Sequence, residues 1–501
     1  MLTRRSFVAG ASAATARAAA SKPNFLFLIA DDHAGYVLGA DGNRQANTPH
    51  LDMLASQGTR FAAHYCNSPV CTPSRQSFFT GQLPHAAGVT VLKTPLATDK
   101  PTLARQLKAA GYETAVFGKM HFNRPGSPGL HGFDRLLTEN ELTQAWSHSP
   151  AIAIPAGTAT KKLPWKPFAD PARIWLNADN LPYPRICEEM RSAFLMRNAF
   201  EYLEAHQAKP FAMWLSFQEP HSPFDFPVDS RRRLQQSGEF TPPAAGKEDA
   251  WQVPLIFRDL SPEDKQGIIA AYYNSVSYLD SNIGAVLAKL RSLGLEENTL
   301  VVYMADHGYS LGQHGRFEKH CCYDPALRVP LLMRWPGHVR ESVVHDFTES
   351  VDVPGTILDL LGADPLPLMH GRSLRAYLQG QKVAAARDHV FSEYLENEEA
   401  CMRTATHKYI YCSGKRERTD GYKTADPTPG KYRRLFDLRT DPGELEDISS
   451  ENSGIVSRLQ QMMLARFRET HPESDREPRR LSTDELLDWY LRPRDALAEN
   501  R

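Results

Sequence analysis

The sequence predicts an α/β protein: a large, mostly parallel sheet flanked by helices, with a smaller C-terminal subdomain of short strands and a helix. Two observations carry this prediction. Continuous apolar runs alternate with longer helical patterns over the first two thirds of the chain, which is typical of a parallel sheet. Near residue 380 the composition turns polar, and shorter strand-like runs follow.

Four apolar runs are expected to be strands of the parallel sheet. They are residues 24–30 (NFLFLIA), 113–117 (ETAVF), 211–217 (FAMWLSF) and 299–305 (TLVVYMA). Helical patterns between them include residues 102–110, 187–206 and 265–293. Such runs suit strands that are buried on both faces, and the intervening helices are expected to cover those faces.

The C-terminal part of the chain has a different pattern. Residues 389–394 and 408–412 are expected to be strands, and residues 455–467 form an amphipathic helical pattern. We therefore expect the large α/β domain to span residues 21–378 and an α+β subdomain to span residues 379–501. The charged segment after Pro472 is expected to wrap the surface or to be loosely ordered.

Size, charge and cysteine usage limit the possible functions. A chain of 501 residues can bury a large core, and its net charge of -1 gives no electrostatic case for binding nucleic acid. No apolar run after the N-terminus is long enough to span a membrane. Seven cysteines are few for a disulfide scaffold, so the neighbours Cys321 and Cys322 are interpreted as packing residues.

The N-terminus is interpreted as a targeting signal. Residues 1–20 contain the pair Arg4-Arg5, a weakly apolar run over residues 7–16 and small residues up to Ala20. This pattern is typical of a twin-arginine signal peptide, although an ordinary secretory signal remains the alternative. It predicts a periplasmic or secreted protein with the twin-arginine export machinery as a partner.

Polar residues follow all four predicted strands at the same end of the sheet. Asp31 and Asp32 follow the first strand in the sequence, and Asp306 and His307 follow the last. Ligands of parallel sheets bind at the carboxyl ends of strands. A lone Asp-Asp pair is more often a solvated loop or a helix cap, but two such pairs together predict a site for a hard cation such as Ca²⁺ or Mg²⁺.

The run from residue 71 to residue 75 (CTPSR) predicts a reactive position at the start of a helix. Pro73 suits the first helical turn, which places Cys71 at the N-terminus, where an anion is favoured. Arg75 lies one turn further on the same face and can stay charged beside that anion. The alternative is a buried structural cysteine before an ordinary helix.

This run resembles the signature of the type I sulfatases, a family of the alkaline phosphatase superfamily. The other motifs of the family follow in the same order, at Asp31-Asp32, Lys119 with His121, His221, Asp306-His307 and Lys319. In that family a formylglycine-generating enzyme oxidises the cysteine to formylglycine, and the hydrate attacks a sulfate ester. Many sulfatases have Asn at the position of His307, but iduronate-type members have His. Residues 435–438 with residues 441–444 resemble the C-terminal subdomain of the family, which implies a small antiparallel sheet with a helix.

The resemblance implies a role for each matching residue. The implied catalytic residues are Cys71, Arg75, Lys119, His121, His221, Asp306 and Lys319. The implied ligands of one divalent cation, Ca²⁺ with Mg²⁺ as the alternative, are Asp31, Asp32, Cys71, Asp306 and His307. Asp306 is expected to accept the proton of the nucleophile, His121 to drive release of sulfate, and His221 with Lys319 to protonate the leaving oxygen.

The predicted function is hydrolysis of sulfate esters, carbohydrate or aryl sulfates, by an exported enzyme. A phosphonate or phosphate diester hydrolase of the same superfamily is the nearest alternative, and a sulfated-glycan-binding protein without activity is a more distant one. Residues 145–185, with Trp146, Trp165 and Trp175, could equally line a sugar pocket or cover the core. Arg316 and Glu318 are expected to lie in a solvated loop, with substrate contact as the alternative.

Overall fold

The computed structural model describes residues 22–149, 152–160, 175–230, 232–246, 253–383, 385–415, 421–424 and 430–495. The predicted signal peptide and Trp165 lie outside these residues. Within the described ranges, no helix is both long and apolar enough to cross a bilayer.

The main sheet has eight strands in the order β5-β4-β6-β1-β7-β8-β2-β9. Their bounds are β1 Asn24–Asp31, β2 Thr59–Phe61, β4 Glu113–Gly118, β5 Arg135–Thr138, β6 Phe211–Pro220, β7 Thr299–Ala305, β8 Leu331–Arg334 and β9 Ser342–Val344. Strand β8 is antiparallel to both of its neighbours, and every other pairing in this sheet is parallel. The predicted mostly parallel sheet is confirmed.

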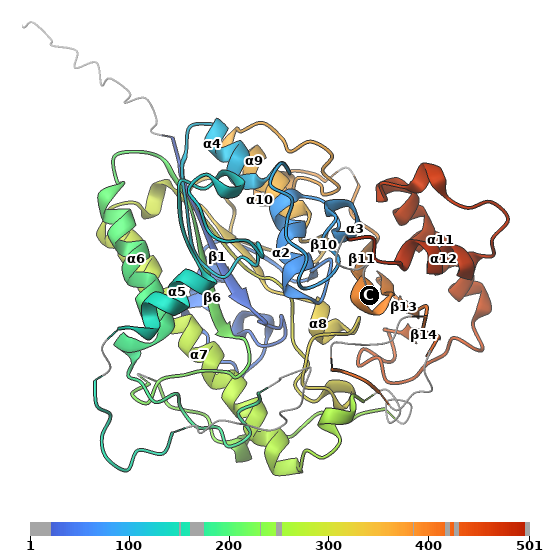
Figure 1. The fold of residues 1–501 in the computed structure, drawn as a ribbon, viewed down its shortest axis with the longest axis horizontal. Coiled ribbons are helices and arrows are strands. Elements are labelled where there is room, and N and C mark those ends of the chain that lie inside the picture. The colour runs from blue at the N-terminus through green and yellow to red at the C-terminus, as the bar shows by residue number, and fades with distance from the viewer. Residues whose placement is uncertain are drawn as a thin grey trace, which may run out of the picture.

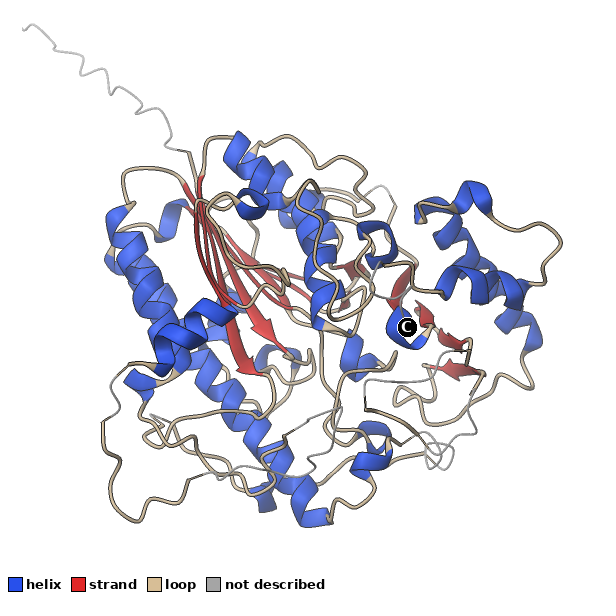
Figure 2. Ribbon diagram, viewed as in Figure 1, coloured by secondary structure: helices blue, strands red, loops and turns tan. Residues whose placement is uncertain are grey.

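Helices cover both faces of this sheet (Figures 1 and 2). One face packs against α1 (Pro49–Ser56), α6 (Arg191–Ala205) and α7 (Pro262–Ser292). The other packs against α2 (Cys71–Thr80), α4 (Leu103–Ala109) and α9 (Asp352–Leu361). Further helices that precede the second sheet in the chain are α3 Pro84–Ala87, α5 Glu139–Ser147, α8 Asp324–Leu327 and α10 Arg375–Leu378.

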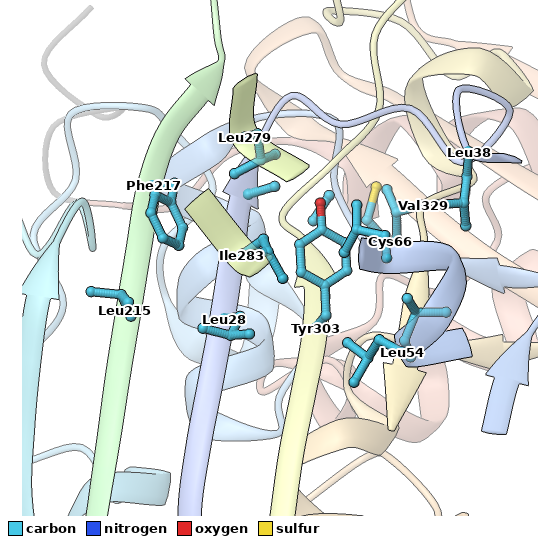
Figure 3. Close-up of a cluster of buried hydrophobic side chains, with 14 of the residues drawn as sticks. Leu28, Leu38, Leu54, Cys66, Leu215, Phe217, Leu279, Ile283, Tyr303 and Val329 are labelled. Carbon is cyan, nitrogen blue, oxygen red and sulfur yellow. The ribbon is translucent and has the colours of Figure 1, made fainter. Parts of the chain in front are cut away.

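Alternating side chains of β1 enter the two layers. Phe25 and Phe27 pack on the α2 side, and Leu28 packs on the α7 side. Figure 3 shows Leu28 on the same face as Leu215 of β6 and Ile283 of α7. Complete burial of such an aliphatic side chain contributes about 1.5–3 kcal/mol. The central strands are thus fixed from both faces, which gives their carboxyl ends a rigid position.

A second sheet of four antiparallel strands follows in the chain, to the right in Figure 1. It contains β11 His389–Tyr394, β12 Glu399–Thr404, β13 His407–Cys412 and β14 Tyr432–Asp437, and it packs against α11 Ser453–Thr470. The predicted antiparallel subdomain is therefore present. A separate two-stranded parallel sheet joins β3 (His64–Tyr65) with β10 (Thr348–Glu349).

The expectation for the segment after Pro472 is wrong. This segment forms α12 (Thr483–Leu491), which begins with a capping box between Ser482 and Glu485. Tyr490 is buried and stacks on Phe467 of α11 at a ring-centroid distance of 5.0 Å. The abundance of charged residues hid a helical stripe of buried residues, which are Leu486, Leu487, Tyr490 and Leu491.

Candidate active site

The two acidic pairs lie side by side at the carboxyl edge of the sheet. Strands β1 and β7 are parallel neighbours, and Ala30 is in register with Ala305, so the residues that follow each strand meet. The Asp32 N–H donates to Asp306 Oδ1 at 3.1 Å, and the His307 N–H donates to the same oxygen at 2.9 Å. Asp32 has a φ of 71°, which turns the chain sharply after the strand.

Cys71 is the first residue of α2, and Val70 is its extended N-cap residue. The whole helix is buried, so the thiol meets the acidic pairs inside the protein. Its sulfur lies 3.7 Å from Asp31 Oδ1 and 3.2 Å from His307 Nε2. The predicted placement of a cysteine at a helix N-terminus therefore agrees with the structure.

Arg75 is completely buried one turn further along α2. Its Nε donates to Asp306 Oδ2 at 2.9 Å, and its Nη1 donates to Ser216 Oγ at 2.9 Å and to the backbone oxygen of Lys119. This guanidinium ties the helix to the ends of β4, β6 and β7. It also offsets part of the negative charge of the carboxylates.

Two lysines approach the same thiol. Lys119 forms an ion pair with Asp31, and its Nζ lies 3.7 Å from Cys71 Sγ. Lys319 Nζ lies 2.6 Å from Asp32 Oδ1 and 3.2 Å from Cys71 Sγ. Burial alone would raise the pKa of the Cys71 thiol, but Lys119, Lys319 and His307 outweigh it and hold that pKa well below its ordinary value.

The carboxylates of the site differ in their affinity for protons. Burial raises the pKa of Asp306 to about 6, despite the opposing charges of Arg75 and His307. Burial would also raise the pKa of Asp31, but Lys119 outweighs it, so this pKa lies below the usual range. The pKa of His307 rises to about 9, because the Asp306 charge outweighs the effect of burial. The pKa values of Asp306 and His307 are thus raised, whereas that of the neighbouring Asp31 is lowered.

Two further histidines border the cluster. His121 interacts with the Cys71 thiol, and burial together with Lys119 lowers its pKa. The Nε2 of His221, which follows the end of β6, lies 4.0 Å from Asp32 Oδ2. The structure therefore brings all ten residues singled out in the sequence to one place.

A divalent cation fits the residues present. The donor atoms of Asp31, Asp32, Cys71 and His307 all lie within 4.8 Å of one another. Asp32 Oδ2 is buried and accepts no hydrogen bond, which is costly for a carboxylate oxygen without a cation. Asp306 lies beside this group, with its Oδ2 3.5 Å from His307 Nε2. Asp31, Asp32 and His307, with residue 71, would hold the cation, and Asp306 stays a predicted ligand.

Sequence reasoning missed two supporting residues. Glu139, at the start of α5, accepts the backbone N–H groups of Met120 and His121, each at 3.0 Å. Ser216 donates to the backbone oxygen of Lys119 at 2.6 Å. A serine within the apolar run of residues 211–217 was a usable signal, whereas nothing in the sequence connects Glu139 with His121.

The expectation of a solvated loop at Arg316 and Glu318 is wrong. Both side chains are buried and form an ion pair, with Arg316 Nη1 2.6 Å from Glu318 Oε1. Trp146, in the aromatic insertion, donates its Nε1–H to the Glu189 backbone oxygen at 2.8 Å, and the guanidinium of Arg185 lies over its ring. This tryptophan packs within its own segment.

The geometry suits attack on an ester of a tetrahedral oxyanion. A nucleophile at a helix N-terminus, next to buried cations and a metal site, is surrounded by positive charge where negative charge develops. This is the chemistry of the alkaline phosphatase superfamily.

Comparison with known proteins narrows this class to one family. The chain belongs to the sulfatase family: the model described as Sulfatase matches residues 23–363, and the model described as N-sulphoglucosamine sulphohydrolase, C-terminal, matches residues 312–471. The protein is thus a sulfuric ester hydrolase, and the family implies a divalent metal and formylglycine.

Relatives and solved structures agree with this assignment. A choline-sulfatase of Rhizobium meliloti is 27% identical over 481 residues, which cover 89% of this chain and 86% of the relative. A Delta 4,5-hexuronate-2-O-sulfatase of Bacteroides thetaiotaomicron is 27% identical over 460 residues, 86% of each chain. The solved phosphonate monoester hydrolase of Silicibacter pomeroyi aligns with a TM-score of 0.73 at 26% identity, covering 89% of this chain and 96% of that one.

Proposed function

We propose that this sulfatase is exported and acts on sulfated carbohydrates, with residue 71 as formylglycine and one bound Ca²⁺. The observation that carries the mechanism is the convergence of Lys119, Lys319 and His307 within 3.7 Å of Cys71 Sγ. The sulfur stands in for an oxygen of the converted residue. The positive charges of the two lysines at this atom favour an oxygen that develops negative charge.

Proton movements follow from the groups around residue 71. Asp306 has a pKa of about 6 through burial, so it can accept a proton near neutral pH and is the proposed base. Arg75 holds its carboxylate in place at 2.9 Å. His121, which the pKa shift keeps neutral, is the proposed acceptor of the second proton, during release of sulfate.

The leaving oxygen needs a proton when the alcohol is a poor leaving group. His221 and Lys319 both lie beside Asp32, with His221 Nε2 4.0 Å from Oδ2 and Lys319 Nζ 2.6 Å from Oδ1, and we assign protonation of the leaving oxygen to them. A bound divalent cation would polarise a sulfate oxygen and offset the charge of the carboxylates. Carboxylate oxygens suit Ca²⁺ and Mg²⁺ alike, and Ca²⁺ accepts the less regular geometry.

The names of relatives support the proposed substrate class, and the pattern of residues 1–20 supports the proposed location. One relative is named as a hexuronate sulfatase, which favours a sugar, while another is named as a choline-sulfatase. Residues 1–20 carry the twin-arginine pattern and lie outside the described residues. Export of a folded enzyme by the twin-arginine machinery would follow conversion of Cys71 in the cytoplasm by a formylglycine-generating enzyme.

A phosphonate or phosphate diester hydrolase is the second candidate, because the fold is shared with phosphonate monoester hydrolases. Released sulfate from a panel of sulfated mono- and oligosaccharides, compared with cleavage of a phosphate diester, tests the two. We expect kcat/KM for the best sulfate ester to exceed that for the diester by at least roughly tenfold, or about 1.4 kcal/mol in barrier. Faster diester cleavage would favour the second candidate.

A further inference from the structure

A cleft of about 640 Å³ opens beside His121, between the loop that follows α3 and the first turn of α5. The polar residues that matter below are Lys93, Asn123, Arg124, Glu139 and Glu141. His121 also interacts with the Cys71 thiol, so the cleft begins next to the nucleophile. This position suits the alcohol portion of a sulfate ester.

The loop that carries Lys93 is fixed to the nucleophile's helix. Thr72 Oγ1, next to Cys71 in the chain, donates to the Leu92 backbone oxygen at 2.6 Å. Asn123 Nδ2 donates to the same oxygen at 2.9 Å. Since consecutive Cα atoms are about 3.8 Å apart, Lys93 is anchored within one residue of these contacts.

The far side of this loop is held by the end of the chain. Asp495 is buried, and its Oδ2 accepts the Thr90 N–H at 2.6 Å and the Thr94 hydroxyl at 2.7 Å. Its Oδ1 accepts the Thr90 hydroxyl at 2.9 Å. Lys93 therefore projects from a loop that is restrained on both sides.

The two cationic side chains that line the cleft are not paired with its carboxylates. Within the described ranges, neither Lys93 nor Arg124 forms an ion pair, and Arg124 donates its Nε–H only to the Leu96 backbone oxygen at 3.0 Å. Both side chains are exposed.

The carboxylates of the cleft, in contrast, have partners. Both oxygens of Glu139 accept backbone N–H groups, and Glu141 accepts the Thr138 hydroxyl and the Gly126 N–H. Both glutamates lie in the first turn of α5, where the helix dipole stabilises negative charge. Among the charged groups that line the cleft, Lys93 and Arg124 are therefore the ones left to meet a ligand.

We propose that this cleft holds the alcohol portion of the substrate, and that Lys93 and Arg124 select sugars with a second anionic group, a carboxylate or a further sulfate. The proposal rests on the sulfatase activity described above and adds its substrate class. A flexible ammonium and a planar guanidinium on one wall can bind one anion together.

A pair of substrates that differ only in charge tests the proposal. The carboxylate 3-(4-sulfooxyphenyl)propanoate and its primary amide release the same kind of phenol. We expect the wild-type enzyme to prefer the carboxylate by about tenfold in kcat/KM, and Lys93→Gln and Arg124→Gln each to reduce this preference by about threefold, as for exposed ion pairs. The double variant should show almost no preference, with turnover of the amide unchanged.

Arg105→Gln is the matched control. Arg105 also donates to a backbone oxygen of the same loop region, that of Thr98 at 2.6 Å, but does not line the cleft. Its preference should equal that of the wild type. A preference that survives the double variant, or falls equally in Arg105→Gln, overturns the proposal.

Calorimetry separates binding from turnover. Titration of the two substrates into the Cys71→Ala variant, with and without the double substitution, should show the same loss of charge preference in Kd. If wild-type enzyme hydrolyses neither compound nor 4-nitrophenyl sulfate, the sulfatase activity itself is contradicted. Normal 4-nitrophenyl sulfate hydrolysis without any carboxylate preference contradicts the cleft alone.

Discussion

The active-site cluster and a second buried cluster, around Lys408 of β13, contain the same kinds of residue but differ in proton affinity. Lys408 Nζ lies 2.9 Å from Asp324 Oδ1 and 2.7 Å from Glu444 Oε1, and it is completely buried. Burial would raise the pKa of Asp324, but Lys408 and Arg403 outweigh it and lower it. Asp324 and Lys408 therefore stay ionised at neutral pH, whereas burial raises the pKa of Glu444 despite the charge of Lys408.

The active-site cluster is different because one of its carboxyl groups, that of Asp306, titrates close to neutrality. Asp306 has a pKa of about 6 and His307 one of about 9, each set by burial and by the charge of the other groups. The cluster also contains a nucleophile next to a cleft. Buried charge alone therefore does not identify an active site. Buried charge does so when one of the groups titrates near neutral pH and a cleft leads to the nucleophile.

The largest expected effect comes from Cys71→Ala. The variant should lose at least about 10⁴-fold in kcat, because the reacting atom is removed, and should remain folded. In wild-type protein from a host with the modifying enzyme, the peptide containing Cys71 should be about 18 Da lighter than its thiol form. Full activity of the variant would contradict the proposed mechanism.

Lys408→Met tests the structural half of the comparison. Removing the cation leaves Asp324 and Glu444 buried without their shared partner, so the free energy of unfolding should fall by about 3–5 kcal/mol. Activity per folded molecule should be unchanged. Lys209→Met is the control, since this side chain is 69% exposed and pairs at the surface with Glu113, so its loss should stay within about 1 kcal/mol. Denaturant unfolding measures the free energy of unfolding of both variants. Equal losses would contradict the structural role of the buried lysine.

Removal of the metal should act on both activity and stability. A cation at 100 times its Kd stabilises the fold by about 2.7 kcal/mol, so chelation should lower the melting temperature and the activity together. Re-addition of Ca²⁺ should restore both. Elemental analysis that finds no divalent metal in active protein, or two equivalents, would contradict a single site.

The smallest expected effect concerns His64 of β3, which is fully buried and feels the charge of Arg387. Burial, with the charge of Arg387, lowers its pKa from 6.5 to about 3. Below pH 6.5 the unfolded chain takes up a proton that the folded protein rejects, so stability falls as the pH falls. As the pH falls from 6.5 to about 5, the lowered pKa of His64 should reduce the free energy of unfolding by about 2 kcal/mol.

Urea unfolding at the two pH values measures this effect. His64→Gln should flatten the pH dependence by about one proton, while His148→Gln, at an exposed position, should leave it as in the wild type. An unchanged slope in His64→Gln would show that His64 does not carry the effect.

The sequence predicted the central strands most accurately, because each of them is a continuous apolar run. Residues 299–305 are β7 at both ends, and 24–30 fall one residue short of β1, because continuous apolar runs leave no other assignment in a parallel sheet. The acidic pairs could be placed together because both follow neighbouring strands. Lys119, His121 and His221 follow β4 and β6 and so lie at the same edge of the sheet. Cys71, Arg75 and Lys319 do not follow these strands directly, and the resemblance to sulfatases assigned them to the site.

Features that depend on tertiary contacts could not be predicted. Glu139 supports His121 through backbone N–H groups, which no pattern of side chains reveals. The pairing of Arg316 with Glu318 is buried because other segments cover it. The helix α12 was missed because its charged surface dominates the composition. The domain boundary at residue 378 stays a prediction, although the second sheet begins at His389.

The burial of Cys71 sets a time limit on its conversion. Only 2% of this residue is exposed, so an enzyme that oxidises the thiol cannot reach it in the finished fold. Lys319, which closes over the thiol, is synthesised long after Cys71. At ordinary rates of translation the interval is on the order of ten to fifty seconds. Oxidation of the nascent chain therefore competes with folding, and a chain that folds first keeps its thiol and stays inactive.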